Sequence, residues 1–295
     1  MGGVATPAKG TTVFVRRSLV SLHRTPEPEA EVVTQARLGE VGGILETGGT
    51  GAEGWVCLAM SHDGYTGWTR TEGLAEGVWP APGAPVVAVR QLFANVYAAP
   101  KVQAPLLLTV PLGTPLPELG AEGEWRRVGL PGNGEGFVQA GDVCRGAEAW
   151  AWESLPELRR SLVRVARQLL GLPYRWGGTT PWGLDCSGLV QLVYRLHGIL
   201  LPRDACEQAR DGRTVAVSRN DLQPGDLLFF ADRSHVGLAV SHWEFIHATT
   251  HETPVVQVSA VDEAYWAGRR DEIRRLPLLP ADRRRPEGTG GGTSA

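Results

Sequence analysis

The stretch Asp185-Cys186-Ser187-Gly188 decides the fold of the C-terminal half, because it places a cysteine where a helix begins. Residues 171–178, just before it, are rich in turn-forming glycine and proline. After it, apolar residues recur at helical spacing until Gly198, which predicts the end of that helix. A thiol at a helix N-terminus faces unpaired N–H groups and the positive end of the helix dipole, which favour the thiolate. The sequence therefore predicts a nucleophilic cysteine with a lowered pKa.

A base for this thiol is predicted from the residues that follow. Three apolar runs predict consecutive strands of a mostly antiparallel sheet: residues 226–230, 236–240 and 244–248. His235 precedes the second run and His247 lies in the third. The short connection 241–243 favours a hairpin, which brings the two histidines together. We expect Cys186 to meet His235, with His247 orienting the ring of His235.

Structural explanations for these residues stay open at this point. A buried cysteine is usually inert, and a single histidine is more often structural than catalytic. A metal site built from Cys186, Cys206, His235 and His247 is a further alternative. Their spacing contains none of the usual ligand pairs of zinc sites, so the sequence predicts no metal and no organic cofactor.

A set of short motifs in a fixed order narrows these alternatives. They are Tyr174–Gly178, Asp185–Val190, Leu201–Arg203, Pro224–Leu227, Ser234–Gly237 and Ile246–Ala248. Residues 155–280, which contain them, resemble the NlpC family of cell-wall cysteine peptidases. The resemblance implies a papain-like α+β core with a Cys-His-His triad. It also implies cleavage of peptidoglycan stem peptides, typically between γ-D-glutamate and a diamino acid such as diaminopimelate.

The resemblance assigns roles to the catalytic residues. Cys186 matches the nucleophile, His235 the base and His247 the orienting residue. The tyrosine near the thiol corresponds to Tyr174. Attack on an amide creates an oxyanion that needs donors, and the Cys186 N–H and the Tyr174 hydroxyl are candidates for this role.

Three further residues are candidate substrate contacts. Asp185 and Ser187 flank the nucleophile and match substrate-contacting positions of the family. Asp185 would pair with a cationic amino terminus of the substrate, or cap the following helix, and both roles stay open. Arg203 is either a substrate contact or a surface charge at a helix start.

An internal duplication precedes this region. Residues 13–16 recur as residues 87–90, and Leu38-Gly39 recurs as Leu112-Gly113 at the same offset. The two copies consist of short apolar strands between Gly- and Pro-rich turns, which is typical of small β-barrels. They resemble bacterial SH3-like domains. The predicted fold class is thus α+β, with a papain-like NlpC-type domain preceded by two small SH3-like barrels.

The first copy carries Glu40 and Tyr65, whereas the second has Thr114 at the position of Glu40. In NlpC-type enzymes with two barrels, the resemblance implies that the first barrel contributes an acid and a tyrosine to the substrate's free amino terminus. We assign those roles to Glu40 and Tyr65. The alternative is that both are ordinary surface residues of the barrel. If the first barrel blocked one end of the active-site groove, the enzyme would be restricted to peptides with a free L-alanine terminus.

The 295 residues provide room for the following predicted segments. They are a disordered tail (1–10), a first barrel (11–80), a second barrel (84–145), the peptidase domain (150–280) and a second disordered tail (281–295). A net charge of −3 and a pI near 6.2 argue against a nucleic-acid partner. No stretch is apolar enough for a signal peptide or a membrane span. Because one of the four cysteines is needed as a free thiol, the chain suits a reducing compartment. The sequence therefore predicts a cytoplasmic protein.

The predicted function is that of a cysteine endopeptidase which hydrolyses the γ-D-glutamyl–diaminopimelate bond. Its substrates are expected to be free murein peptides that begin with L-alanine, in cell-wall peptide recycling. Two alternatives remain. One is a peptidoglycan-binding SH3-module protein with secondary hydrolase activity, and the other is a papain-like amidase or acyltransferase.

Overall fold

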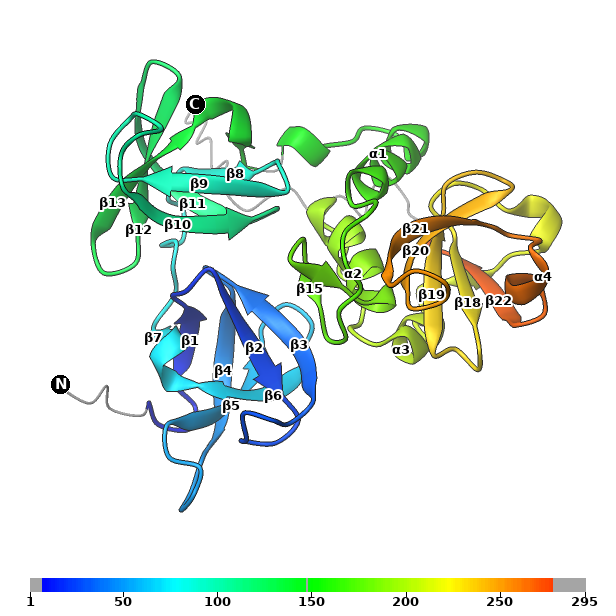
Figure 1. The fold of residues 1–295 in the computed structure, drawn as a ribbon, viewed down its shortest axis with the longest axis horizontal. Coiled ribbons are helices and arrows are strands. Elements are labelled where there is room, and N and C mark those ends of the chain that lie inside the picture. The colour runs from blue at the N-terminus through cyan, green and yellow to red at the C-terminus, as the bar shows by residue number, and fades with distance from the viewer. Residues whose placement is uncertain (1–6, 147, 278–295) are drawn as a thin grey trace, which may run out of the picture.

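The computed structural model describes residues 7–146 and 148–277. Figure 1 shows two β-rich bodies stacked on one side of the molecule and a further sheet on the other side. Helices lie between the two bodies and that sheet. Along the chain, these parts are two barrels followed by an α+β domain.

The two barrels have the same topology. The first comprises β1 (Thr12–Val15), β2 (Leu19–His23), β3 (Val32–Arg37), β4 (Val41–Thr47), β5 (Trp55–Met60), β6 (Thr66–Arg70) and β7 (Leu74–Glu76). The second comprises β8 (Val86–Val89), β9 (Phe93–Tyr97), β10 (Leu106–Pro111), β11 (Pro115–Glu122), β12 (Trp125–Leu130), β13 (Gly134–Gln139) and β14 (Val143–Arg145). Their strand orders are β3-β2-β6-β5-β4-β1-β7 and β10-β9-β13-β12-β11-β8-β14. Each strand of the first barrel thus has its counterpart at the same place in the second, which confirms the predicted duplication.

Equivalent side chains support the duplication. In the first barrel, His23 meets Trp55 edge-on at a centroid distance of 5.4 Å. In the second, Tyr97 meets Trp125 in the same way at 5.8 Å. Each barrel also encloses its own cluster of buried apolar side chains.

The C-terminal domain consists of two long helices, a six-stranded antiparallel sheet and short elements. Its helices are α1 (Leu155–Gln168), α2 (Cys186–Leu196), α3 (Ala205–Ala209) and α4 (Ala264–Ala267). The small hairpin β15 (Thr179–Thr180) and β16 (Gly183–Leu184) precedes α2. The sheet comprises β17 (Val215–Ala216), β18 (Leu227–Phe230), β19 (His235–Ala239), β20 (Glu244–Thr249), β21 (Val255–Ala260) and β22 (Arg270–Arg275). Its order is β17-β22-β18-β19-β20-β21, so the predicted histidine hairpin β19–β20 is confirmed.

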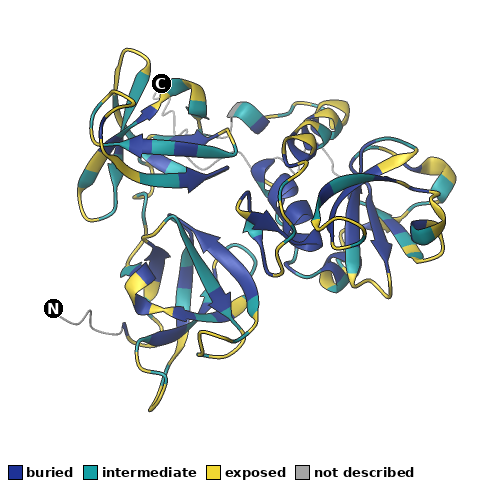
Figure 2. Cartoon of the chain, viewed as in Figure 1, coloured by how far each residue is buried: buried dark blue, intermediate teal, exposed yellow. Residues whose placement is uncertain are grey.

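The core of this domain lies between α1, α2 and one face of the sheet. Phe229, Val236 and Leu238 pack on that side with Leu189 and Val193 of α2. Figure 2 shows α2 buried along its length and α1 exposed along its outer side. The opposite face of the sheet has a separate aromatic cluster that includes α4.

The second barrel docks on this core. Ala88 and Leu112 belong to the same buried cluster as the helices, together with Trp150 from the connecting segment. The short linker therefore joins packed bodies, as the sequence predicts.

The predicted tails are only partly covered by the structure. Residues 1–6 and 281–295 lie outside the described residues. Gly10, within the predicted first tail, donates its N–H to the carbonyl of Ile44 at 2.8 Å, so the chain is attached to the barrel from that point. Within residues 7–146 and 148–277, no helix has the length and apolarity that a bilayer span requires.

Candidate active site

Cys186 is the first residue of α2, as predicted. Its Sγ atom lies 3.9 Å from the carbonyl oxygen of Ser234, and the backbone N–H of Val236 acts on the thiol to lower its pKa. Ser234 and Val236 flank His235. The sulfur therefore lies against the strand segment that carries the predicted base.

The glycines around Cys186 allow two backbone segments to meet. A Cβ atom on Gly188 would lie 2.1 Å from the carbonyl oxygen of Gly178, which no side chain can tolerate. The same contact is stabilised by the N–H of Asp185, which donates to that oxygen at 3.1 Å. Glycine at 188 therefore lets the loop before the cysteine pack directly on the first turn of α2.

The two predicted histidines form a hydrogen-bonded pair. Nε2 of His235 lies 2.8 Å from Nδ1 of His247, which is fully buried. Nε2 of His247 in turn lies 3.0 Å from Oγ of Ser259 on β21. The predicted contact between His235 and His247 is confirmed. Ser259 was not predicted, because it lies in none of the recognised sequence motifs.

Aromatic side chains from the far face of the sheet enclose the histidines. The indole of Trp266 on α4 stacks on the His235 ring with centroids 5.3 Å apart, and meets the His247 ring edge-on at 4.6 Å. Phe245 packs against His247 at 4.6 Å. These rings fix the imidazole planes; His247 is fully buried, and His235 stays partly exposed.

This burial controls the protonation of the thiol and the imidazoles. Burial raises the pKa of Cys186 to about 12, and the charge of Asp185 acts in the same direction. Burial lowers the pKa of His235 to about 4, although Asp185 opposes that change. It lowers the pKa of His247 to about 2. At neutral pH, Cys186 is therefore a thiol and His235 a neutral imidazole.

The predicted lowering of the thiol pKa is thus wrong in direction. The sequence argument considered the helix N-terminus alone. In the structure, the Asp185 carboxylate occupies that N-terminus and accepts the N–H of Gly188 at 2.7 Å. A negative cap next to a buried sulfur disfavours the thiolate. That His235 removes this proton as the sulfur attacks stays a prediction.

A pH profile follows from these values. His235 can accept a proton only while it is neutral, which holds above its pKa. Because that pKa is lowered to about 4, we expect the acidic limb of kcat/KM to fall well below the ordinary imidazole value of about 6.5. The measurement is kcat/KM from pH 4 to 8 on a peptide substrate. An acidic limb near pH 6.5 would contradict the buried neutral imidazole.

Arg203 forms hydrogen bonds with side chains at the N-terminal end of α2. It is 2% exposed, and its guanidinium donates to both oxygens of Asp185, at 3.0 and 2.5 Å, and to Oγ of Ser187 at 2.9 Å. Its Nε donates to Thr34 of the first barrel at 3.0 Å. This corrects both predictions for Arg203, since it is neither a surface charge nor placed to contact substrate.

The same network decides between the alternatives for Asp185. Its carboxylate accepts from Gly188, Gly177 and Arg203, so its charge is already paired. The helix-cap role therefore holds, and the prediction that it pairs with a substrate ammonium is corrected. Ser187 is also buried and donates to Asp185 at 3.3 Å, which places it in this network, and its predicted substrate contact stays a prediction.

Tyr174 lies beside the thiol. It is half-buried, and burial raises the pKa of its hydroxyl, with Cys186 and Asp185 acting in the same direction. Its backbone N–H donates to Pro254 at 2.8 Å, which ties the loop to the β20–β21 turn. Its predicted role toward the oxyanion or the substrate stays a prediction.

Tyr65 reaches the catalytic domain from the first barrel. Its hydroxyl lies 3.2 and 3.1 Å from the two carboxylate oxygens of Asp204 and donates to them. Asp204 precedes α3 at the N-cap position, yet its side chain makes no capping bond there. The carboxylate is half-buried and has no ion pair among residues 7–146 and 148–277. No role was predicted for Asp204 from the sequence, although this residue directly follows the motif that ends at Arg203.

Comparison with known proteins identifies the family. The NlpC/P60 family matches residues 171–275, and the bacterial dipeptidyl-peptidase SH3 domain matches residues 22–74. The chain is 31% identical over 263 residues to the gamma-D-glutamyl-L-lysine dipeptidyl-peptidase of Bacillus cereus, covering 83% of this chain and 75% of that protein. The chain belongs to the NlpC/P60 family of peptidases.

Two further relatives extend over most of this NlpC/P60 chain. Dipeptidyl-peptidase 6 of Lysinibacillus sphaericus is 27% identical, covering 86% of this chain and 93% of that protein. A crystal structure of an NlpC/P60 family protein from Bacillus cereus superposes with a TM-score of 0.76 at 24% identity. That alignment covers 90% of this chain and 99% of the solved one, so the two share the fold. The predicted family and fold class are confirmed.

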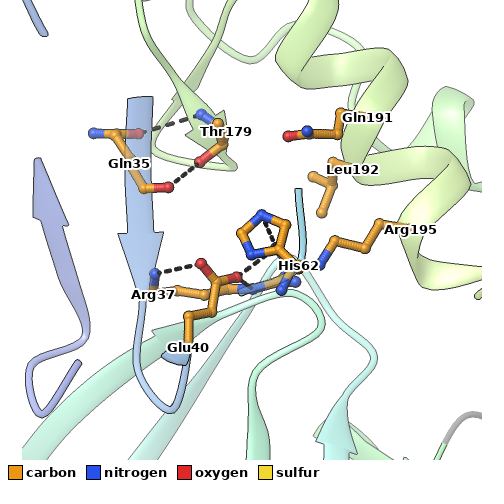
Figure 3. A pocket seen from close by; sticks show the side chains of 8 residues that line it. All are labelled: Gln35, Arg37, Glu40, His62, Thr179, Gln191, Leu192 and Arg195. Atoms are coloured by element: carbon orange, nitrogen blue, oxygen red, sulfur yellow. Dashed lines mark hydrogen bonds and ion pairs between the residues drawn. The ribbon is translucent and has the colours of Figure 1, made fainter. Parts of the chain in front are cut away.

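Glu40 occupies a different place from the one predicted for it in this NlpC/P60 protein. Its carboxylate lies 2.8 Å from Arg37 and 2.7 Å from Arg195 of α2, at the contact between the first barrel and the catalytic domain (Figure 3). Although burial alone would raise its pKa, Arg195 and Arg37 lower the pKa of Glu40 to about 2. The enclosed space there is about 10 Å³, enough for one water at most. The predicted substrate contact is corrected to an interdomain ion pair.

This placement can be tested with Glu40→Gln. The substitution leaves the buried guanidinium of Arg37 and the partly exposed one of Arg195 without their anion, and we expect a loss of about 3 kcal/mol in the free energy of unfolding. The KM for a free peptide should rise as well, because the same barrel carries Tyr65. Urea unfolding and steady-state kinetics measure the two effects. A raised KM with unchanged unfolding would instead indicate direct contact between Glu40 and the substrate.

Proposed function

We propose that this NlpC/P60 protein is a cysteine peptidase that hydrolyses the γ-D-glutamyl–diamino acid bond of free murein peptides beginning with L-alanine. The observation that carries the proposal is the joint placement of two groups. Cys186 lies at the N-terminus of α2 with its sulfur against the backbone of Ser234 and Val236, which flank His235 of the His235–His247 pair, and the Tyr65–Asp204 pair lies at the boundary with the first barrel. The names of the relatives in Bacillus and Lysinibacillus, both dipeptidyl-peptidases, support it.

The first half-reaction forms a thioester. Nε2 of His235 is engaged with His247, which leaves Nδ1 to take the thiol proton as Sγ attacks the γ-carbonyl carbon. The oxyanion accepts hydrogen bonds from the Cys186 N–H and the Tyr174 hydroxyl. As the carbon–nitrogen bond breaks, His235 returns the proton to the leaving amine of the diamino acid.

The second half-reaction releases the dipeptide. Water attacks the thioester carbon while His235 takes its proton, and the thiolate leaves and is reprotonated by His235. The products are L-Ala-γ-D-Glu with a new γ-carboxylate and a free diamino acid or shorter peptide. Because this cycle needs only acyl transfer to and from Cys186 and proton transfers through His235, the proposal includes no cofactor.

Asp204 supplies the selectivity for a free amino terminus. Its neighbour Arg203 directs its N–H groups to Asp185, Ser187 and Thr34 and acts on Asp204 only through its charge, as Arg24 does, so the Asp204 carboxylate can still accept a hydrogen bond from a cation at the edge of the site. Tyr65 holds that carboxylate from the barrel side. An ammonium group of L-alanine would complete the pair, whereas an acylated nitrogen carries no charge and adds bulk.

The chemistry of that substrate implies its origin. The alanine nitrogen is acylated as long as the peptide is attached to the glycan, so a free ammonium exists only on released peptides. We therefore include peptide recycling in the proposal. A cytoplasmic location of the protein stays a prediction. Cell fractionation with an antibody against the protein tests the location.

The function is tested by offering the purified protein three substrates: free L-Ala-γ-D-Glu-diaminopimelate, its N-acetylated form and intact peptidoglycan. We expect release of diaminopimelate from the first, at least about tenfold slower release from the second, and none from the third. Mass spectrometry of the products identifies the bond cleaved. Equal cleavage of the acetylated peptide would contradict the amine requirement, and preferential transfer to an added amine would favour the acyltransferase alternative.

A further inference from the structure

We propose that Ser259 is a positioning residue whose hydroxyl accepts the Nε2 proton of His247 and so stabilises the tautomer in which His235 is a base toward Cys186. The inference rests on the proposed function, because it concerns the proton transfers of that reaction. It starts from one chain of contacts: His235 Nε2 to His247 Nδ1 at 2.8 Å, and His247 Nε2 to Ser259 Oγ at 3.0 Å.

Each neutral imidazole carries one proton, so this chain has two possible states. In the first, Ser259 accepts from His247 Nε2–H, His247 Nδ1 accepts from His235 Nε2–H, and His235 Nδ1 presents a lone pair to the thiol. In the second, every proton is reversed, and His235 presents an N–H to the thiol. Only the first state can remove the proton of Cys186.

The surroundings of His247 leave Ser259 as the partner of Nε2. His247 is fully buried between Phe245 and Trp266, and Ser259 itself is 8% exposed. Without the hydroxyl, a proton on Nε2 would be a buried donor without an acceptor, which costs about 1–3 kcal/mol. The pair would then move to the reversed state, in which Nδ1 of His247 donates to His235.

The same chain stabilises the intermediate in which His235 is protonated. His235 then donates from Nε2 to His247, which must remain an acceptor at Nδ1 and therefore keeps its own proton on Nε2. Ser259 is the acceptor of that proton. Since burial lowers the pKa of both rings, each hydrogen bond that favours this arrangement contributes to the rate.

The test combines kinetics with direct observation of the tautomers. For Ser259→Ala we expect kcat to fall about tenfold to a hundredfold with little change in KM, the fold-change that corresponds to one unpaired buried donor. Ser259→Thr is the matched control, because it retains the hydroxyl and should restore most of kcat. A raised KM with unchanged kcat, or full activity of Ser259→Ala, would overturn the proposal.

NMR of histidine-labelled protein gives a readout that does not depend on the variants folding. In the wild type we expect the His247 ring to be protonated on Nε2 and the His235 ring on Nε2. A His247 ring protonated on Nδ1 would overturn the proposal. This NMR readout does not depend on turnover. If the protein cleaved none of the murein peptides, the proposed function would be wrong, and the NMR spectra would still decide the tautomers.

Discussion

Replacing Cys186 by serine is expected to reduce peptide hydrolysis by about 10⁴-fold or more while the protein stays folded. The hydroxyl is nearly the same size as the thiol, so the packing at the start of α2 is preserved. The neutral His235 is a weak base because burial lowers its pKa to about 4, and a hydroxyl proton is far harder to remove than a thiol proton. Release of diaminopimelate measured by chromatography reports the loss.

Cys206→Ser is the matched control for this prediction. Cys206 is a free, partly buried thiol on α3 of the same domain, and within residues 7–146 and 148–277 no contact places it beside the histidines. We expect it to retain activity. If Cys206→Ser lost activity and Cys186→Ser kept it within about tenfold, the nucleophile would have been assigned to the wrong thiol.

Replacing Asp204 by asparagine should have the second largest effect, and it should be selective. The variant keeps the shape and a hydrogen bond to Tyr65 but loses the charge that would pair with the substrate ammonium. A charge-assisted hydrogen bond of about 1.5–3 kcal/mol predicts a loss of roughly 10-fold to 150-fold in kcat/KM for the free peptide. The N-acetylated peptide should be almost unaffected, so the preference for the free terminus disappears.

Tyr65→Phe provides a graded comparison for Asp204→Asn. It removes only a neutral hydroxyl that holds the carboxylate at 3.1 Å, so a loss of about fivefold is expected. Because the Asp204 side chain makes no capping bond to α3, the unfolding of Asp204→Asn should be close to that of the wild type. Equal losses on the free and acetylated peptides would assign Asp204 to structure rather than to recognition of the amine.

Features that depend on short stretches of sequence were predictable. The start of α2 at Cys186 follows from a cap residue before a periodic apolar run. The start of α1 depends on an equally local signal, because Ser154 Oγ accepts the N–H of Glu157 three residues later. The histidine hairpin follows from two strands separated by a short turn. In each case, neighbouring residues carry the whole signal.

Features that depend on distant partners were not predictable from the sequence. Arg203 meets Thr34 across 169 positions, and Glu40 meets Arg195 across the domain boundary, so the sequence offered each of them only as a substrate contact or a surface residue. Asp204 acquires its role only because the barrel delivers Tyr65 to it. The direction of the Cys186 pKa shift also depends on how deeply the folded chain buries the sulfur.

The central claim is that the thiol of Cys186 becomes acylated by the L-Ala-γ-D-Glu portion of the substrate. Rapid quenching of the reaction in acid, followed by digestion and mass spectrometry, measures this directly. The account predicts a transient adduct of that dipeptidyl mass on the peptide containing Cys186, which disappears as product accumulates. Turnover of the free peptide with no adduct on Cys186 at any time, or with the adduct on another residue, would contradict it.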